Sequence, residues 1–96
     1  MIFECDQNKN NANKAKHKVS FETALLVFFD EFHRTLFDRT ENGEDRWHTI
    51  GKVEGVELLL VVHTYTDDNG EEIVRIISAR RPTRKERICY EQGNRT

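Results

Sequence analysis

The sequence predicts an α+β fold in which two N-terminal helices pack on an antiparallel sheet of about four strands, followed by a C-terminal helix. Three observations predict it. Apolar residues recur at helical spacing between Ser20 and Phe32, strand-forming segments joined by tight turns fill residues 46–80, and the pattern changes again at Pro82. A chain of 96 residues holds one modest core, so we expect residues 1–96 to form a single domain.

The first 17 residues predict a short edge strand and a polar helix. Residues 2–5 are apolar enough for a brief strand, and Asp6 is a suitable cap for a helix that runs to about His17. Asparagines favour turns over helix interiors, so this helix is expected to be weak. Its polar residues recur at helical spacing and are expected to face solvent: Asp6, Lys9, Asn13, Lys16 and His17.

The second predicted helix begins after Ser20, which is a favourable N-cap residue. Its apolar residues follow the spacing of a buried helix face: Phe21, Ala24, Leu25, Phe28 and Phe32. Burying each large side chain contributes about 1.5 to 3 kcal/mol. We therefore expect this helix to be the main anchor of the sheet.

The strands follow in quick succession. Residues 34–37 predict a short strand and residues 38–45 a polar loop, and longer strands are expected at 46–53, 56–66 and 72–80. The turns at 54–55 and 67–70 are short, which forces antiparallel neighbours.

Alternation along these strands separates two faces of the sheet. In residues 46–53 it places Arg46, His48, Ile50 and Lys52 on one face, opposite Trp47, Thr49, Gly51 and Val53. In residues 74–80 it places Val74, Ile76, Ser78 and Arg80 opposite Arg75, Ile77 and Ala79. One face must pack on the phenylalanine-rich helix, and the other is expected to stay open and to carry Arg, His and Lys.

Residues 74–90 are strongly basic. They hold one acid, Glu86, and six cations: Arg75, Arg80, Arg81, Arg84, Lys85 and Arg87. The segment sums to +5 in a chain of net charge −2. Thr83 and Glu86 form a capping box, so a strand is expected to run into a helix with arginines at the junction. Guanidinium groups on a rigid base suit phosphate binding, and the alternative is an ordinary solvated face.

Composition excludes some classes of protein. The two cysteines, Cys5 and Cys89, are far apart and have no ligand spacing typical of a zinc site, so no metal or cofactor is expected. No apolar run approaches the roughly 20 residues that span a bilayer, and no leader is recognisable at Met1. We expect a reduced cytoplasmic protein that does not enter a membrane.

The chain resembles the BrnT family of type II toxins, which are small relatives of the RelE-like ribonucleases. The resemblance runs through residues 3–24 (FECDQNKNNANKAKHKVSFETA), 46–51 (RWHTIG), 59–64 (LLVVHT) and 75–90 (RIISARRPTRKERICY). Two positions depart from the family pattern. Cys5 stands where tryptophan is typical, and Lys18 stands where glycine is typical, at a turn that favours positive φ.

This resemblance implies a metal-independent endoribonuclease that cleaves mRNA and inhibits translation. It also implies a ribbon-helix-helix antitoxin, similar to BrnA, whose complex with the toxin binds operator DNA. A rival hypothesis from the residues alone is a non-catalytic nucleic-acid-binding or protein-binding module, and a third is an oligomeric scaffold.

RNA cleavage requires deprotonation of the 2′-hydroxyl, neutralisation of the phosphorane and protonation of the leaving oxygen. The candidate catalytic residues are Arg75, Arg80, His63 and Glu86, and the candidate RNA-binding residues are Arg81, Arg84, Lys85, Arg87, Tyr90 and His17. Each residue outside the arginines has a structural alternative. For His63 it is an ordinary strand-end histidine, for His17 a partner of the helix dipole, for Glu86 a helix cap, and for Tyr90 a core residue. His48 and His33 rank lower as proton-transfer groups.

Overall fold

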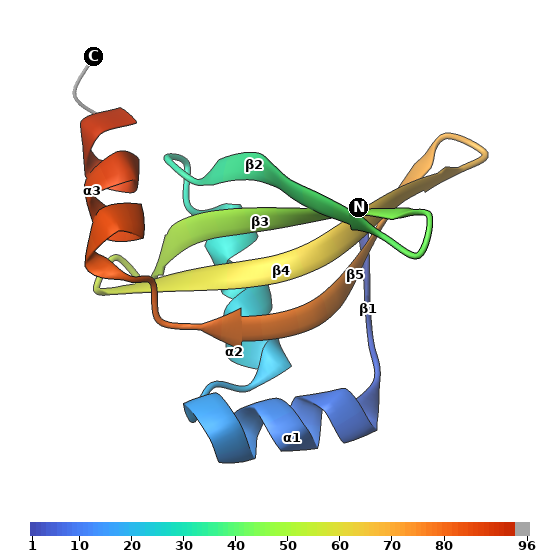
Figure 1. Cartoon of the computed structure of the whole chain (residues 1–96), viewed down its shortest axis with the longest axis horizontal. Helices are drawn as coiled ribbons and strands as arrows, with labels where there is room; N and C mark the ends of the chain where they lie inside the picture. The colour runs from blue at the N-terminus through green and yellow to red at the C-terminus, as the bar shows by residue number, and fades with distance from the viewer. Residues whose placement is uncertain (94–96) are drawn as a thin grey trace.

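Five strands form one mixed sheet in the computed structural model, which describes residues 1–93 (Figure 1). The strands are ordered β1 (Ile2–Cys5), β5 (Glu71–Arg80), β4 (Glu57–Asp68), β3 (Glu44–Val53) and β2 (Arg34–Glu41). The α+β class is confirmed, but the expectation of a purely antiparallel sheet is wrong. The predicted edge strand at residues 2–5 joins the sheet parallel to β5, and all other neighbours are antiparallel.

Tight turns connect the four successive strands β2, β3, β4 and β5. Residues 54–56 join β3 to β4, and Glu54 and Gly55 have positive φ, 53° and 72°. Asn42 and Gly43 form a two-residue turn between β2 and β3, with φ of 53° and 76°. Residues 38–45 are therefore a hairpin and not the predicted loop, because Asn-Gly is a strong signal for a two-residue turn of this kind.

Helix α1 (Gln7–His17) is capped by Asp6 at its N-terminus and by Lys18 at its C-terminus. The Asp6 side chain accepts hydrogen bonds from the amides of Asn8 and Lys9. Lys18 ends the helix in the left-handed conformation, with φ of 61°, at the position where glycine is typical of the family. The helix packs against β5, and the expectation that its whole polar stripe faces solvent is wrong, because Asn13 is only 6% exposed.

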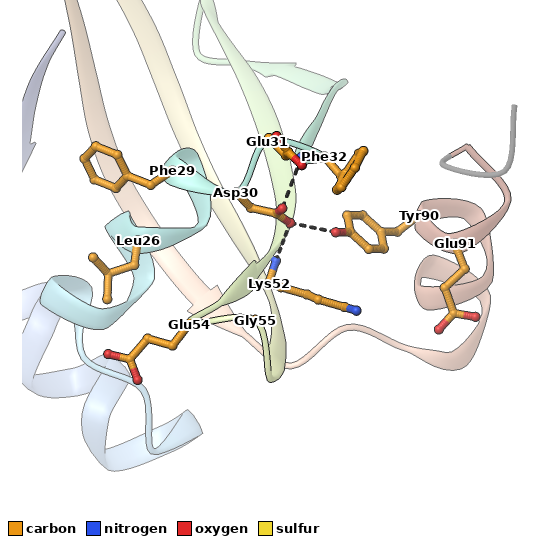
Figure 2. A pocket seen from close by; sticks show the side chains of 10 residues that line it. All are labelled: Leu26, Phe29, Asp30, Glu31, Phe32, Lys52, Glu54, Gly55, Tyr90 and Glu91. Carbon is orange, nitrogen blue, oxygen red and sulfur yellow. Dashed lines mark hydrogen bonds between the residues drawn. The ribbon is translucent and has the colours of Figure 1, made fainter.

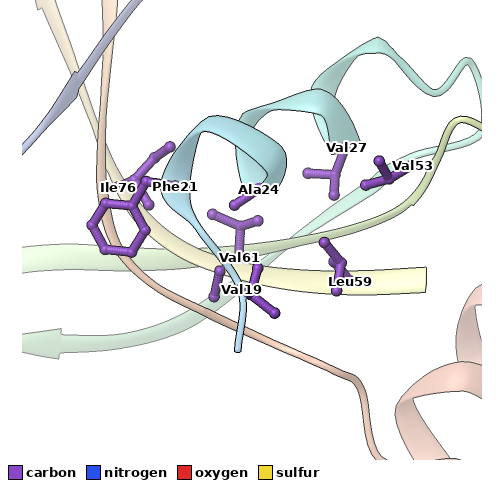
Figure 3. Close-up of a cluster of buried hydrophobic side chains, with 9 residues drawn as sticks. Val19, Phe21, Ala24, Val27, Val53, Leu59, Val61 and Ile76 are labelled. Carbon is purple, nitrogen blue, oxygen red and sulfur yellow. The ribbon is translucent and has the colours of Figure 1, made fainter. Parts of the chain in front are cut away.

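The second predicted helix changes form after one turn. Helix α2 (Phe21–Ala24) tightens into the 3₁₀ helix η1 (Leu25–Phe29), which ends before the predicted buried residue Phe32. Phe32 is 53% exposed, and Val27 takes a buried position instead. Figure 3 shows the resulting core against β3 to β5, formed by Val19, Phe21, Ala24, Val27, Val53, Leu59, Val61, Ile76 and Ala79.

The backbone of η1 lies directly on β3. A Cβ at Gly51 would come within 2.7 Å of the Val27 carbonyl oxygen, so only glycine allows this approach. Leu25 and Phe28 are partly buried and pack against the core. Helix α2 and η1 thus cover one face of the sheet.

Helix α3 (Arg84–Gly93) lies at the end of the opposite face. The predicted capping box is present: the Glu86 amide donates to Thr83 Oγ1 at 3.2 Å, and the Thr83 amide donates to Glu86 Oε1 at 2.8 Å. Tyr90 packs with Ile50 and Leu58 in a second, smaller core. None of the helices described has the length and hydropathy of a membrane-spanning segment.

Candidate functional site: the open face of the sheet

The sheet face opposite α2 and η1 carries most of the chemistry, and we call it the open face. Cross-strand pairing aligns Leu36, His48, Val62 and Ser78 in one row and Arg34, Ile50, Leu60 and Arg80 in the next. Arg46 joins this face because it lies two residues before His48 on β3. The predicted alternation of β3 is confirmed, with Trp47, Thr49, Gly51 and Val53 turned toward the helices.

A bulge in β5 decides which arginines share this face. Val62 pairs with Ser78 and His63 pairs with Ile76, so Ile77 has no partner on β4. This extra residue reverses the alternation on one side of the bulge. Arg75 therefore lies on the open face with Ser78 and Arg80, and the simple alternation predicted for residues 74–80 is wrong.

Arg80 is held by Glu86 through one edge of its guanidinium. Nη1 donates to Oε1 at 2.8 Å and Nη2 donates to Oε2 at 3.0 Å. Among the described residues, the other edge, formed by Nε–H and the second Nη2 hydrogen, has no hydrogen-bond partner. The hydrogen bonds from Arg80 lower the pKa of Glu86 to about 2, so this carboxylate stays ionised across the physiological range.

The other arginines of the basic segment are not one continuous patch. Arg75 Nη2 donates to both oxygens of Glu44 on β3, at 2.6 and 2.8 Å. Arg81 pairs with Glu57 at 2.8 Å and lies beside Val19 and Leu59, on the side of the sheet that α2 covers. The free protein thus neutralises several cations locally.

Three exposed cations line α3: Arg84, Lys85 and Arg87. The helix that carries them is fastened to the sheet edge by Arg34, whose Nη1 donates to the Cys89 carbonyl at 3.0 Å. These three cations therefore lie near the end of the open face that holds Arg80.

His63 lies in the core, on the opposite face from Arg80. Its side chain is fully buried, with Nε2 2.7 Å from Thr49 Oγ1 and its ring against Phe28 and Tyr65. Burial lowers the pKa of His63 to about 4. A neutral imidazole without solvent access is poorly placed to exchange protons with RNA, and this position supports the structural interpretation of the residue.

Tyr90 is buried between α3 and the sheet, and His17 lies on α1. Tyr90 is 4% exposed, so neither face of its ring is available to stack on a base. His17 lies in the last turn of α1, which packs against β5, and it is half-buried. Tyr90 is therefore not available to stack on a base, and His17 belongs to a different element from the side chains around Arg80.

A separate hollow lies on the far side of Tyr90 (Figure 2). Its volume is about 990 Å³, and its centre is Asp30, which accepts hydrogen bonds from the Tyr90 hydroxyl at 2.6 Å and the Lys52 amide at 2.7 Å. Glu31, Glu54 and Glu91 line it as well. This concentration of carboxylates is unfavourable for a phosphate backbone.

The described residues bring no three His, Cys, Asp or Glu side chains together as metal ligands. The side chains gathered on the open face are instead guanidinium groups and the imidazole of His48. Sequence reasoning ranked His48 below His63. The signal that separates them is strand alternation, because His48 shares a face with Arg46, while His63 shares one with Val61 and Leu59.

Comparisons with known proteins agree with this architecture. A family model described as "Ribonuclease toxin, BrnT, of type II toxin-antitoxin system" matches residues 5–86. The crystal structure of the Brucella abortus ribonuclease toxin BrnT is similar with a TM-score of 0.59 and 22% identity, covering 88% of this chain and 100% of that one. The similarity to the crystal structure shows that the two proteins share a fold. A comparison with curated proteins finds no match.

Proposed function

This chain belongs to the BrnT family of ribonuclease toxins of type II toxin–antitoxin systems, and from that premise we propose that it cleaves mRNA internally on the open face of its sheet. As a toxin of this class it has RNA as its substrate and an antitoxin as its partner. The observation that carries the location of the site is the bulge in β5, which places Arg75 and Arg80 on the same face as His48.

Arg80 is the proposed phosphate-binding group at the cleaved bond. Its Nε and Nη2 edge matches two oxygens of a phosphate, while Glu86 holds the opposite edge. Charge that develops on the phosphorane is stabilised best by a donor that is already oriented. We assign Glu86 to orienting Arg80, because a carboxylate with a pKa of about 2 is a weak proton acceptor at neutral pH.

His48 is the proposed proton-transfer group. Imidazole titrates nearest to neutral pH among side chains, and His48 is half-buried in the row next to Arg80. Removal of the 2′-proton lets the 2′-oxygen attack the phosphorus while the bond to the 5′-oxygen breaks. The products are a 2′,3′-cyclic phosphate and a 5′-hydroxyl that has gained a proton.

Flanking phosphates are assigned to Arg75 on the sheet and to Arg84, Lys85 and Arg87 on α3. Arg75 must exchange its bonds with Glu44 for bonds to phosphate when RNA binds. Contacts of this kind position the strand and carry little base specificity. This chemistry uses side chains alone, so cleavage is proposed to proceed without a metal ion and to persist in EDTA.

Arg80→Ala tests the site. We expect loss of growth arrest on induction and a rate of cleavage of a defined RNA lowered by roughly 10²- to 10³-fold, because one charge-stabilising donor is removed. Arg80→Lys keeps the charge without the fork and should stay clearly impaired. The neighbouring variant Arg81→Ala is the matched control, since it also loses an ion pair with a glutamate but faces the other side of the sheet. Near-normal cleavage by folded Arg80→Ala would overturn the assignment.

The antitoxin is proposed to be a ribbon-helix-helix protein that covers the open face and links the toxin to operator DNA. An acidic or apolar segment would complement the arginines of this face. Co-expression followed by purification should yield a stoichiometric complex that no longer cleaves RNA. A complex with full ribonuclease activity would show that the antitoxin binds elsewhere.

A further inference from the structure

A buried asparagine of α1 completes the edge of the sheet beside Arg80. Asn13 Nδ2 donates to the carbonyl of Ala79 at 2.9 Å, and Asn13 Oδ1 accepts from the amide of Ala79 at 3.1 Å. The same Nδ2 also donates to the carbonyl of Val19 at 2.8 Å. One side chain thus bonds both backbone groups of the residue that precedes Arg80.

The position of Ala79 in the sheet explains why this side chain is needed. β1 pairs with β5 only from Ile73 to Ile76, so beyond the bulge no strand within residues 1–93 continues on that side. Ala79 is fully buried, and an unpaired buried amide and carbonyl would each be costly. The primary amide of Asn13 takes the place of a neighbouring strand over one residue.

Asparagine suits this position chemically. Its amide offers donors and an acceptor on a short side chain, whereas aspartate offers only acceptors and would face the carbonyls of Ala79 and Val19. Both bonds to Ala79 hold the strand in the register that follows the bulge. That register directs the next side chain, Arg80, to the open face.

We infer that Asn13 is a positioning residue for RNA cleavage, acting on Arg80 through the backbone of Ala79. The inference rests on the proposed role of Arg80. Asn13 lies away from the open face and contacts no group that we assign to RNA. Asn13 fixes the position of the strand end and therefore that of the Arg80 guanidinium. A displacement of about 1 Å in a catalytic group is enough to lower an enzymatic rate by roughly 10²-fold.

Asn10 provides a matched control within the same helix. It is fully buried, its Oδ1 accepts from the amide of Phe21 at 2.9 Å, and its Nδ2 donates to Glu22 at 2.8 Å. These hydrogen bonds connect α1 to α2, and neither of them goes to β5. A general loss of stability should therefore appear in variants of both asparagines, and a loss of positioning only in variants of Asn13.

The experiment measures kcat and KM for cleavage of a defined RNA oligonucleotide by Asn13→Ala, Asn10→Ala, Arg80→Ala and the double variant Asn13→Ala/Arg80→Ala. All assays are run below the unfolding temperature of each protein. We expect Asn13→Ala to lower kcat by roughly 10- to 100-fold with KM nearly unchanged, and Asn10→Ala to keep the wild-type kcat. In the Arg80→Ala background, loss of Asn13 should have no further effect on kcat.

Three outcomes would overturn the inference. Wild-type kcat in folded Asn13→Ala, with Arg80→Ala inactive, removes the positioning role and leaves the proposed function intact. If Asn13→Ala lowers kcat by the same factor in the wild-type and in the Arg80→Ala background, Asn13 does not act through Arg80. Full activity of Arg80→Ala overturns the inference together with the proposed site.

Asn13→Ser keeps the test decisive if Asn13→Ala does not fold. A hydroxyl group can restore part of the hydrogen bonding, so kcat should lie between those of wild type and a cleavage-deficient variant. Amide hydrogen exchange provides the structural measurement. The Ala79 amide should exchange faster in Asn13→Ser and stay protected in Asn10→Ala, and unchanged exchange at Ala79 in Asn13→Ser would contradict the proposed link.

Discussion

The histidines of the sheet show how one position in a strand decides the chemistry of a side chain. His48 and His63 lie on neighbouring strands, but on opposite faces. His48 is half-buried beside the arginines, whereas His63 is enclosed by Thr49, Phe28 and Tyr65. The first is the residue that we propose for proton transfer, and the second is a packed core residue whose pKa is lowered by burial.

Burial of His63 predicts acid sensitivity in a defined pH window. The folded-state pKa of about 4 lies below the ordinary value of 6.5, so the unfolded chain binds more protons between these values. Stability should be highest above pH 6.5 and fall as pH decreases toward 4. With about 1.4 kcal/mol for each pKa unit, the loss from this group is at most about 3.5 kcal/mol. The measurement is the free energy of unfolding from urea titrations at a series of pH values.

His63→Gln should flatten this pH dependence between 4 and 6.5, because glutamine keeps hydrogen-bonding capacity without titrating. The slope is compared, and not the absolute stability, because the substitution can also change packing. An unchanged slope in His63→Gln would assign the acid sensitivity to other groups.

At the scale of elements, α3 connects the two proposed parts of the RNA surface. It presents the exposed cations Arg84, Lys85 and Arg87, and it supplies Glu86 to Arg80. Besides the packing of Tyr90 on Ile50 and Leu58, polar contacts hold it in place. They include the Arg80–Glu86 pair, the bond from Arg34 to the Cys89 carbonyl, and the bond from Tyr90 to Asp30. The orientation of α3 thus determines where the helix cations lie relative to the sheet.

Tyr90→Phe should loosen α3 while leaving the sheet folded. Burial alone would raise the pKa of Asp30, but hydrogen bonds from the Lys52 amide, the Tyr90 hydroxyl and the Phe32 amide outweigh it and lower the pKa. Loss of a bond to this ionised carboxylate is expected to destabilise the protein by about 2 kcal/mol. Amide hydrogen exchange should become faster across α3, as followed by NMR or mass spectrometry.

Tyr65→Phe is the control for this prediction. It removes the hydroxyl of a half-buried tyrosine on β4 and changes no residue of α3. Equal acceleration of α3 exchange in both variants would mean that Tyr90 contributes no specific attachment. Unchanged amide exchange across α3 in Tyr90→Phe would likewise show that the Tyr90 hydroxyl does not attach α3.

At the scale of the whole molecule, charge is divided between two regions. The open face and α3 carry the arginines that we assign to RNA, and the hollow around Asp30 carries a group of carboxylates. The net charge of −2 therefore gives little indication of where a polyanion binds. Binding by local cations predicts a clear dependence on salt.

RNA affinity should fall linearly with salt on a double-logarithmic plot. If Arg84 contacts a phosphate, Arg84→Ala should reduce the magnitude of the slope by about 0.7, the value expected for one contact to single-stranded nucleic acid. Lys9→Ala, which removes an exposed cation from α1, should leave the slope unchanged. The measurement is fluorescence anisotropy with a cleavage-resistant RNA over a range of salt concentrations, and an unaltered slope in Arg84→Ala would remove this residue from the contact set.

Sequence patterns were sufficient for features that depend on neighbouring residues. The capping box of Thr83 and Glu86, the caps of α1 and α2, the turn at Glu54 and Gly55, and the alternation of β3 were all predicted and are present. The family was also recognisable, because its motifs are contiguous stretches of sequence. Each of these signals is contained within a few residues of the chain.

Tertiary structure decided the features that depend on partners distant in sequence. The bulge at Ile77 arises from the register between β4 and β5, and it alone brings Arg75 and Arg80 to one face. The sequence pattern predicts Asn13 to be a surface residue. In the structure it is buried and bonds to the backbone of Ala79, 66 positions away. His63 became a core residue because Phe28 and Thr49 close around it. The register between strands, and the distant side chains that enclose a buried residue, are properties of the assembled sheet, so local patterns alone do not determine them.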